Sequence, residues 1–395
     1  MDLDAKLDLL GDAARYDLCA THSQAGKRYK AAPRPDEKAS WATPSEAVGQ
    51  RTQPVFRVLM SSRCEWNCTY CPLRAGNDAP RAELTPEELA KAFLPRYEAG
   101  AAQGLFLSSA VSGGVGGAVG RMLDGVELLR KRHAYTGYVH VKLLPGVAAS
   151  DLERAAKLAD RVSLNLEAPG PEYLARISPE RSWEHDLLAR LRWASEWQRA
   201  GALPSGIATQ FVVGAAGEHD RDLLLSGAWL YRDLGLRRVY FSPFRPLVGT
   251  PLAEAAATPQ RRVQRLQEAD WLMRDYGFGA AELPFRGAGD LPLHLDPKLA
   301  WALVNPQRFP VELNRAAREE LLRVPGLGPT GVARILRLRQ IGPFRELSQL
   351  DSLGPAARRA RDFVTLNGRF FGRGHADLLR DLDRPQPIVE QLSFL

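Results

Sequence analysis

Residues Cys64-Glu65-Trp66-Asn67-Cys68-Thr69-Tyr70-Cys71 contain three of the four cysteines in this chain of 395 residues, with the spacing Cys-x3-Cys-x2-Cys. An apolar run at residues 55–60 directly precedes them and predicts a buried strand. Thiolates are soft metal ligands, and a loop this short can bring three of them to one metal centre. Three ligands suit a four-iron cluster that keeps one iron free for a substrate or a cofactor. We therefore expect Cys64, Cys68 and Cys71 to be the ligands of an iron–sulfur site.

The same cysteines have three other interpretations, which the sequence disfavours. A structural zinc site needs a fourth Cys or His at a similarly short spacing, and none is nearby. A redox-active Cys-x-x-Cys pair would ignore Cys64 and would lack its usual helix context. Unligated buried thiols would not gather within eight residues.

Residues 51–256 alternate between strand and helix patterns. The stretch Thr85-Pro86-Glu87-Glu88 predicts a helix start, with a hydroxyl N-cap, a proline in the first turn and acids near the positive end of the helix dipole. Such alternation predicts an α/β fold with parallel strands and right-handed crossovers. Strands are expected at residues 55–60, 105–109, 138–143, 161–166, 207–213 and 238–241. Further helices are expected near residues 120–133, 150–160, 182–200 and 219–234.

The cysteine spacing, the aromatic Tyr70 before the last cysteine and the six strand–helix units resemble the radical S-adenosylmethionine (SAM) superfamily. This resemblance implies a partial (β/α)6 barrel of TIM type, whose active site lies at the carboxyl ends of the strands. It also implies a [4Fe–4S] cluster whose open iron is chelated by the amino and carboxylate groups of SAM. One electron, from an external donor such as flavodoxin or ferredoxin, would cleave SAM to methionine and a 5′-deoxyadenosyl radical.

The resemblance also implies cofactor contacts at other strand ends. Where the family usually carries Gly-Gly-Glu, this chain has Ser108-Ser109-Ala110, so hydroxyl and carbonyl groups would have to accept the bonds of the methionine amino group. Alternation points Ser163, Asn165 and Glu167 toward the barrel interior, where that strand lines SAM in the family. The expected cofactor-binding residues are Tyr70, Ser108, Ser109, Asn165, Glu167, Val213 and Gly214, the last two near the adenine.

Glu167 and the glycine-rich stretch at residues 112–117 each have a second interpretation. Glu167 could form a salt bridge with a neighbouring Arg or Lys instead, and Lys142 on the preceding strand is one candidate. The glycine-rich stretch at residues 112–117 lacks the Gly-Lys-Ser/Thr ending of a phosphate-binding P-loop. It is expected to be a mobile lid near the substrate or a plain flexible connection.

Composition and the N-terminal residues indicate the kind of partner and the cellular compartment to expect. A net charge of +7 makes a polyanionic partner plausible. Neither a run of about 18 apolar residues nor a secretion signal is evident. We therefore expect a cytoplasmic protein, whose reducing surroundings suit the cluster. Residues 1–50 are expected to form an N-terminal helical extension, and its Cys19 is either a candidate hydrogen-atom donor near the cluster or a small buried apolar residue.

Residues 311–384 resemble the helix-hairpin-helix modules of DNA-binding and repair proteins. A Pro-Gly-x-Gly turn at residues 325–328 separates two helical runs, and residues 347–363 repeat the design loosely. In such a hairpin the backbone approaches a phosphate, which binds the free N–H groups at the second helix. The region holds 14 Arg, no Lys and nine acidic residues, which also suits a phosphate-facing surface. The resemblance implies nucleic-acid contacts by Gly326, Leu327, Gly328, Thr330, Gly331, Arg334 and Gly354; the other interpretation is a helix pair for protein contact.

The final residues 385–395 form a proline-containing tail. Its Gln391, Leu392, Phe394 and Leu395 resemble the peptide by which bacterial replication and repair proteins bind the DNA sliding clamp, although the usual Leu-Phe order is reversed. The other interpretation is a terminus that folds back on its own domain.

The combined pattern predicts a radical SAM barrel at residues 51–280, a bridging segment at 281–310 and a nucleic-acid-binding domain, taken as all-α, at 311–384. It resembles a bacterial radical SAM family described as DNA modification or repair proteins. The expected reaction is hydrogen abstraction from a base or sugar by the 5′-deoxyadenosyl radical, on a target extruded from the stack. DNA is favoured over RNA as substrate. Three alternatives stay open: a tRNA- or rRNA-modifying enzyme, a non-catalytic cluster sensor of redox state or damage, and a small-molecule enzyme with an incidental helical appendage.

Overall fold

The computed structural model describes residues 1–14, 42–46 and 52–383. Cys19 and the tail residues Gln391, Leu392, Phe394 and Leu395 lie outside the described residues. The chain divides into two compact units, one formed by Met1–Glu218 with Trp229–Val263 and one by His219–Ala228 with Gln264–Leu395. Within the described ranges, no helix is both long enough and apolar enough to cross a membrane.

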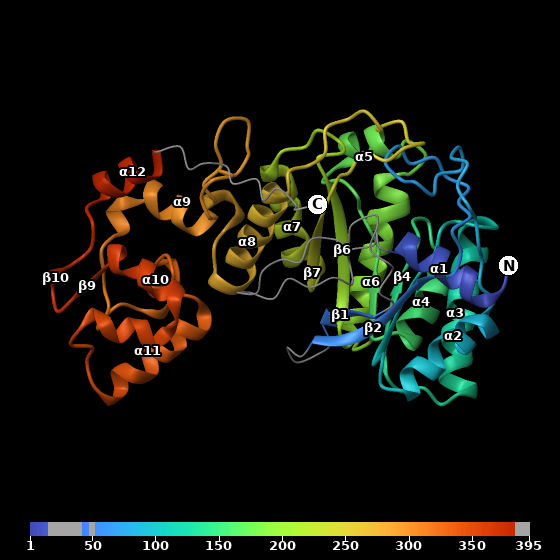
Figure 1. The fold of residues 1–395 in the computed structure, drawn as a ribbon, viewed down its shortest axis with the longest axis horizontal. Helices are drawn as coiled ribbons and strands as arrows, with labels where there is room; N and C mark the ends of the chain where they lie inside the picture. The colour runs from blue at the N-terminus through green and yellow to red at the C-terminus, as the bar shows by residue number, and fades with distance from the viewer. Residues whose placement is uncertain (15–41, 47–51, 384–395) are drawn as a thin grey trace. The chain divides into compact units, whose positions relative to one another are not determined.

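The first unit is built on one sheet of seven strands in sequential order (Figure 1). Its strands are β1 (Ala42–Glu46), β2 (Thr52–Leu59), β3 (Gly104–Ser108), β4 (Tyr138–Lys142), β5 (Arg161–Ser163), β6 (Gly206–Val213) and β7 (Arg238–Pro243). The strands β2 to β7 are all parallel, which confirms the prediction of six parallel strands. The strand β1 pairs antiparallel with β2 and was not predicted, since its sequence has no apolar run.

The six parallel strands curl toward one another, as a partial barrel requires. Val55 on β2 and Tyr240 on β7 belong to the same buried cluster, together with Phe106 and Ala208. Because β2 and β7 are the first and last parallel strands, this shared core can form only if the sheet bends around it. Apolar side chains therefore fill the barrel interior and leave the carboxyl ends of the strands to form the site.

Helices connect successive parallel strands, and several of them flank one side of the sheet in Figure 1. Those of the first unit are α1 (Leu3–Ala14), α2 (Pro86–Glu98), α3 (Gly114–Arg132), α4 (Ala149–Leu158), α5 (Pro171–Ile177), a π-helical turn (Trp183–Leu188) and α6 (Ala189–Arg199). Two more helices, α7 (Asp220–Leu234) and α8 (Gln260–Tyr276), contribute residues to both units.

The glycine-rich stretch at residues 112–117 is not the loop that the sequence suggested. Gly113 is the N-cap of α3 and Gly114 is the first residue of that helix. Both glycines have left-handed φ angles, +66° and +71°, which a residue with a side chain adopts at a cost. The glycines therefore allow an abrupt entry from the end of β3 into α3.

The second unit combines short helices with a small sheet. Its helical segments after α8 are a 3-10 turn (Ala280–Glu282), α9 (Pro297–Val304), a 3-10 turn (Pro306–Arg308), α10 (Arg318–Arg323), α11 (Pro329–Ile341), the 3-10 segments Leu347–Leu353 and Pro355–Phe363, and α12 (His375–Asp383). The strands β8 (Val311–Glu312), β9 (Val364–Leu366) and β10 (Arg369–Phe370) form a sheet of order β10-β9-β8. The expectation of an all-α region is wrong here, because strands this short carry no readable alternation.

A buried lysine supports the turn between α10 and α11. Lys298 on α9 is only 7% exposed and donates a hydrogen bond from Nζ to the Leu327 carbonyl at 2.5 Å. Its ammonium group also lies 4.7 Å from the centre of the Tyr276 ring. Burial lowers the pKa of Lys298 to about 7. The turn therefore rests on a side chain that is costly to bury in its charged form.

The capping box of α2 offers a direct test of local stability. The Thr85 hydroxyl accepts a hydrogen bond from the Glu88 amide, and the Glu88 carboxylate accepts one from the Thr85 amide. We expect Thr85→Ala to lower the free energy of unfolding by about 1 kcal/mol, because one helix N–H loses its acceptor. Denaturant unfolding measures this, with Thr85→Ser as the control that keeps the acceptor. Equal destabilisation by both variants would contradict the capping explanation.

A second prediction concerns Lys298 and pH. The folded state binds fewer protons than the unfolded state between about pH 7 and the ordinary lysine pKa of about 10.4, so this group makes stability rise with pH over that range. We expect Lys298→Met to make the rise in unfolding free energy between about pH 7 and pH 9 shallower than in the wild type. Urea unfolding across this pH series is the measurement, and an unchanged slope would contradict the lowered pKa.

Candidate functional site

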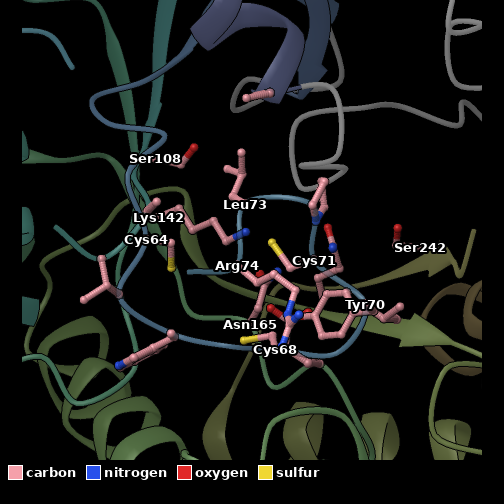
Figure 2. A pocket seen from close by; sticks show the side chains of 18 of the residues that line it. Cys64, Cys68, Tyr70, Cys71, Leu73, Arg74, Ser108, Lys142, Asn165 and Ser242 are labelled. Atoms are coloured by element: carbon pink, nitrogen blue, oxygen red, sulfur yellow. The ribbon is translucent and has the colours of Figure 1, made fainter. Parts of the chain in front are cut away.

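A pocket of about 370 Å³ lies in the first unit, where the carboxyl ends of the parallel strands meet the cysteine loop (Figure 2). Every strand from β2 to β7 brings a residue at or just beyond its carboxyl end to the lining. The polar and charged residues of the lining include Arg74, Ser108, Ser109, Lys142, Asn165, Glu167, Arg181, Gln210, Ser242 and Arg245. The barrel therefore presents a mainly apolar pocket beside the three cysteines, with polar and charged groups at several points of its wall.

The sulfur atoms of Cys64, Cys68 and Cys71 face a shared space in Figure 2, and all three cysteines are free thiols. Burial raises the pKa of Cys68, and burial raises that of Cys71 to about 12. Within the ranges that the structure describes, no three His, Cys, Asp or Glu side chains form a group suited to a single metal ion. Soft donors around a shared space at the end of a barrel instead suit a larger iron–sulfur cluster.

One guanidinium group organises the backbone after the cysteines. Arg81 donates hydrogen bonds to four carbonyl oxygens, at distances between 2.6 and 2.9 Å. These acceptors belong to Ser62, Leu73, Arg74 and Asn77, which lie on both sides of the cysteine stretch. Arg81 thus ties the two ends of the loop together. Arg81 was not predicted, because nothing in the cysteine motif indicates that an arginine ten residues after Cys71 supports the loop.

Glu65, between the first two cysteines, fixes the loop to helix α3. Its carboxylate accepts hydrogen bonds from the amides of Gly113 at 2.6 Å and Gly114 at 3.2 Å. The Glu65 amide in turn donates to the Val111 carbonyl at 2.9 Å. A carboxylate at a helix N-terminus satisfies free N–H groups and interacts favourably with the helix dipole. The glycine-rich stretch therefore serves the cysteine loop as an anchor.

The segment from Ile177 to Arg181 holds the middle of the loop. The Ile177 carbonyl accepts hydrogen bonds from the Thr69 amide at 2.9 Å and from its hydroxyl at 3.2 Å. The Asn67 amide donates to the Glu180 carboxylate at 2.9 Å. The Arg181 guanidinium lies 4.6 Å from the centre of the Trp66 ring. These contacts bind the loop to a part of the chain more than a hundred residues away.

Glu167 lies just after β5 in a left-handed conformation, with φ of +65°. Backbone hydrogen bonds to Gln210 and Val212 on β6 hold it there. Its carboxylate is buried, with Oε1 3.8 Å from Arg181 Nη1. The sequence suggested Lys142 as a possible partner, and the structure gives Arg181. Backbone strain at a pocket residue is typical of a functional site.

The other predicted cofactor residues divide into two groups. Tyr70, Ser108, Ser109 and Asn165 line the pocket. Val213 and Gly214 do not, and Val212 takes their place in the lining. The Val213 carbonyl accepts a hydrogen bond from the Thr258 hydroxyl at 2.5 Å, and a side chain at Gly214 would collide with the same hydroxyl. Gly214 is therefore required for packing against Thr258, and the adenine contact predicted for both residues stays a prediction.

Two oxygen atoms of the lining suggest what the pocket can bind. Among the described residues, Ser108 Oγ and Glu167 Oε2 are buried without a hydrogen-bond partner. A buried polar atom costs free energy until a ligand or water satisfies it. A hydroxyl and a carboxylate oxygen suit a ligand that carries hydrogen-bond donors and positive charge, while Arg181 suits a carboxylate. The lining therefore fits a zwitterionic ligand.

In the second unit, Gly326 and Leu327 serve packing within the unit. Gly326 has φ of +86°, and a side chain there would lie 2.3 Å from the Ala356 carbonyl oxygen. Leu327 is 2% exposed, and its carbonyl accepts the bond from Lys298. Both residues therefore serve packing within the unit, and the nucleic-acid contact predicted for the backbone of this hairpin stays a prediction. The contacts of Gly326 and Leu327 hold the turn in place, and helix α11 follows it directly.

Most of the remaining residues of this set lie in more open positions, whereas a side chain at Gly328 would lie 3.1 Å from the Tyr276 hydroxyl. Gly328 is the N-cap of α11, and Thr330 in its first turn is exposed. No atom lies within 4 Å of a side chain built at Gly331 or Gly354, and Gly354 has φ of +107°. Arg334 donates a hydrogen bond to the Ser352 carbonyl at 2.9 Å, which joins α11 to the 3-10 segment before Gly354.

Comparison with known proteins identifies the first unit. The family model of the radical SAM superfamily matches residues 58–224. No curated protein matches the chain significantly. One similar solved structure is methylornithine synthase (PylB), at 14% identity and a TM-score of 0.44, over 76% of this chain and 85% of that one. Another is the [FeFe]-hydrogenase maturase HydG from Carboxydothermus hydrogenoformans, at 17% identity and a TM-score of 0.43, over 54% of this chain and 49% of that one.

This chain thus spans about half the length of the HydG maturase. Identities and TM-scores this low say nothing about the reaction. The family match covers the cysteine loop, the strands β3 to β6 and most of the pocket lining. Residues 58–224 therefore form a radical SAM superfamily domain, and enzymes of this superfamily use a [4Fe–4S] cluster and SAM.

Proposed function

We propose that this enzyme modifies or repairs nucleic acid, with DNA favoured over RNA. The observation that carries the proposal is the open N-terminus of α11, which follows a glycine turn in an arginine-rich unit. The pair α10 and α11 has the order helix, tight turn, helix, and the two 3-10 segments around Gly354 repeat it. This order supports the helix-hairpin-helix interpretation of the second unit.

The start of α11 has the properties of a phosphate site. The helix is 13 residues long, and its first turn holds only Pro329, Thr330 and Gly331 after the N-cap. Small residues let a phosphate approach the free N–H groups, and the helix dipole favours its negative charge. Contacts of this kind hold the backbone of a nucleic acid without reading its sequence.

Charge on the rest of the unit agrees with such a partner. Arg358 and Arg359 have side chains that are 70% and 67% exposed. Each lies near one carboxylate, Asp351 and Asp296 respectively, and exposed ion pairs of this kind are weak. These guanidinium groups can therefore turn to phosphates at little cost.

In the first unit we propose that Cys64, Cys68 and Cys71 ligate the cluster and that the pocket holds SAM beside it. When bound, this pair of cofactors supplies radical abstraction of a hydrogen atom. Ser108, Asn165 and Glu167 would bind the amino group of the methionine part, since the unsatisfied oxygens of Ser108 and Glu167 need donors. Arg181 would bind the carboxylate. Ser109 and Tyr70 also line this pocket.

The cysteine ligands give the first test of this assignment. We expect Cys68→Ala, and equally Cys64→Ala or Cys71→Ala, to abolish iron binding and the formation of 5′-deoxyadenosine from SAM under dithionite. Two cysteines and no fourth ligand cannot hold the cluster. Iron and sulfide analysis after anaerobic reconstitution is the measurement, with circular dichroism as a control for folding. Zinc at this position in wild-type protein purified without oxygen would overturn the assignment.

The phosphate site can be tested with a matched pair of variants at opposite ends of α11. We expect Gly331→Glu to weaken binding of duplex DNA at least about tenfold, or about 1.4 kcal/mol, because a carboxylate would meet the phosphate. Gly342→Glu adds the same charge at the C-cap, where the backbone is extended and the space is open, and should change affinity little. Fluorescence anisotropy at low salt measures both.

Competition in the same assay separates the substrate classes. Stronger displacement by tRNA than by duplex DNA would favour an RNA-modifying enzyme. Equal affinity of the Gly331→Glu variant and wild type for every nucleic acid would contradict the proposed phosphate site.

A further inference from the structure

A serine outside the cysteine motif contacts the middle cysteine. Ser178 Oγ lies 3.3 Å from Cys68 Sγ, within hydrogen-bond distance for sulfur. Ser178 is 1% exposed and Cys68 is 4% exposed, so water does not compete for this contact. The serine is the C-cap residue of α5, and its amide donates to the Leu174 carbonyl at 2.7 Å. Its position therefore follows from the end of a helix.

The chemistry of ligation fixes the direction of this hydrogen bond. In the free thiol either atom could donate. A cysteine that ligates iron is a thiolate and has no proton to give. The Ser178 hydroxyl must then be the donor and Cys68 Sγ the acceptor. The bond is thus charge-assisted in the loaded protein.

We propose that Ser178 is a positioning residue that donates a hydrogen bond to the Cys68 thiolate and thereby raises the reduction potential of the cluster. Hydrogen bonds to cluster sulfurs stabilise the more negative, reduced state, and they are one of the means by which proteins set cluster potentials. The enzyme must take one electron from an external donor before it can cleave SAM. A less negative potential makes that first electron easier to accept.

The surroundings of Ser178 keep the hydroxyl directed at the sulfur. The preceding residue, Ile177, accepts two hydrogen bonds from Thr69, which directly follows Cys68. The loop and the serine are therefore held to each other next to the contact as well as through it. Loss of the hydroxyl alone should leave the loop in place.

Cys71 differs from Cys68 in the source of its hydrogen bond. The Cys71 sulfur has a hydrogen bond from the Leu73 backbone, which lies within the loop itself. Cys68 is the ligand whose hydrogen bond comes from a side chain on a different element. This bond can therefore be removed by substitution without changing the loop sequence.

The test uses the isosteric pair Ser178→Thr and Ser178→Val in the full chain, with Ser178→Ala as a smaller variant. Threonine and valine have nearly the same shape, and only threonine keeps the hydroxyl. The reduction potential of the reconstituted cluster is measured by redox titration followed by electron paramagnetic resonance, without SAM or substrate. Thr69→Val is the control, because it removes a nearby hydrogen bond that does not involve sulfur and keeps the backbone bond from the Thr69 amide that holds the loop to this segment.

We expect Ser178→Thr and Thr69→Val to keep the wild-type potential, and Ser178→Val and Ser178→Ala to shift it to a more negative value. Iron and sulfide content is measured for each variant. The potential is compared with the wild type in Ser178→Val or Ser178→Ala, whichever holds a full cluster. An unchanged or less negative potential in that variant would overturn the proposal. Equal shifts for the threonine and valine variants would also overturn it, since packing would then be the cause.

Discussion

The positions of the three cysteines depend on hydrogen bonds that other parts of the fold make to the cysteine loop. Carbonyl groups from both sides of the cysteine stretch converge on the Arg81 guanidinium. Four bonds from one rigid, permanently charged group fix the loop far better than four separate partners could. Glu65 and the Ile177–Arg181 segment add the remaining restraints. The positions of the three thiolates follow from these contacts.

Much of the first unit could be predicted from the sequence, because the information is local. The cysteine spacing, the apolar runs of the parallel strands and the capping box of α2 each lie within a few residues, and the structure has the six parallel strands in the expected order. The edge strand β1 and the strands β8 to β10 were missed, because short or edge strands carry no apolar run or alternation. The glycine-rich stretch was taken for a loop because glycine disfavours helices in general, whereas here two glycines allow a helix to begin.

The candidate site likewise contains residues that could be predicted from the sequence and residues that could not. Cys64, Cys68, Cys71, Ser108, Asn165 and Glu167 lie at strand ends or in the loop, and the pocket brings them together. Arg81, Ser178 and Arg181 could not be predicted, because their roles exist only through contacts across the fold. On β6 the structure places Val212, and not the predicted Val213, at the pocket, because successive side chains of a strand point to opposite faces. A one-residue error in a strand always exchanges its two faces.

A loss of binding after substitution in the glycine turn before α11 would not show that the substituted residue contacts the ligand. Gly326 is needed because the Ala356 carbonyl lies where its side chain would be. Replacing it would disturb the architecture of the whole second unit, and every ligand assayed would then seem to depend on that residue. A mutational scan would rank Gly326 as indispensable for any partner, whether or not it contacts that partner. Gly331, whose surroundings are open, is the position at which a loss of binding can be attributed to the partner itself.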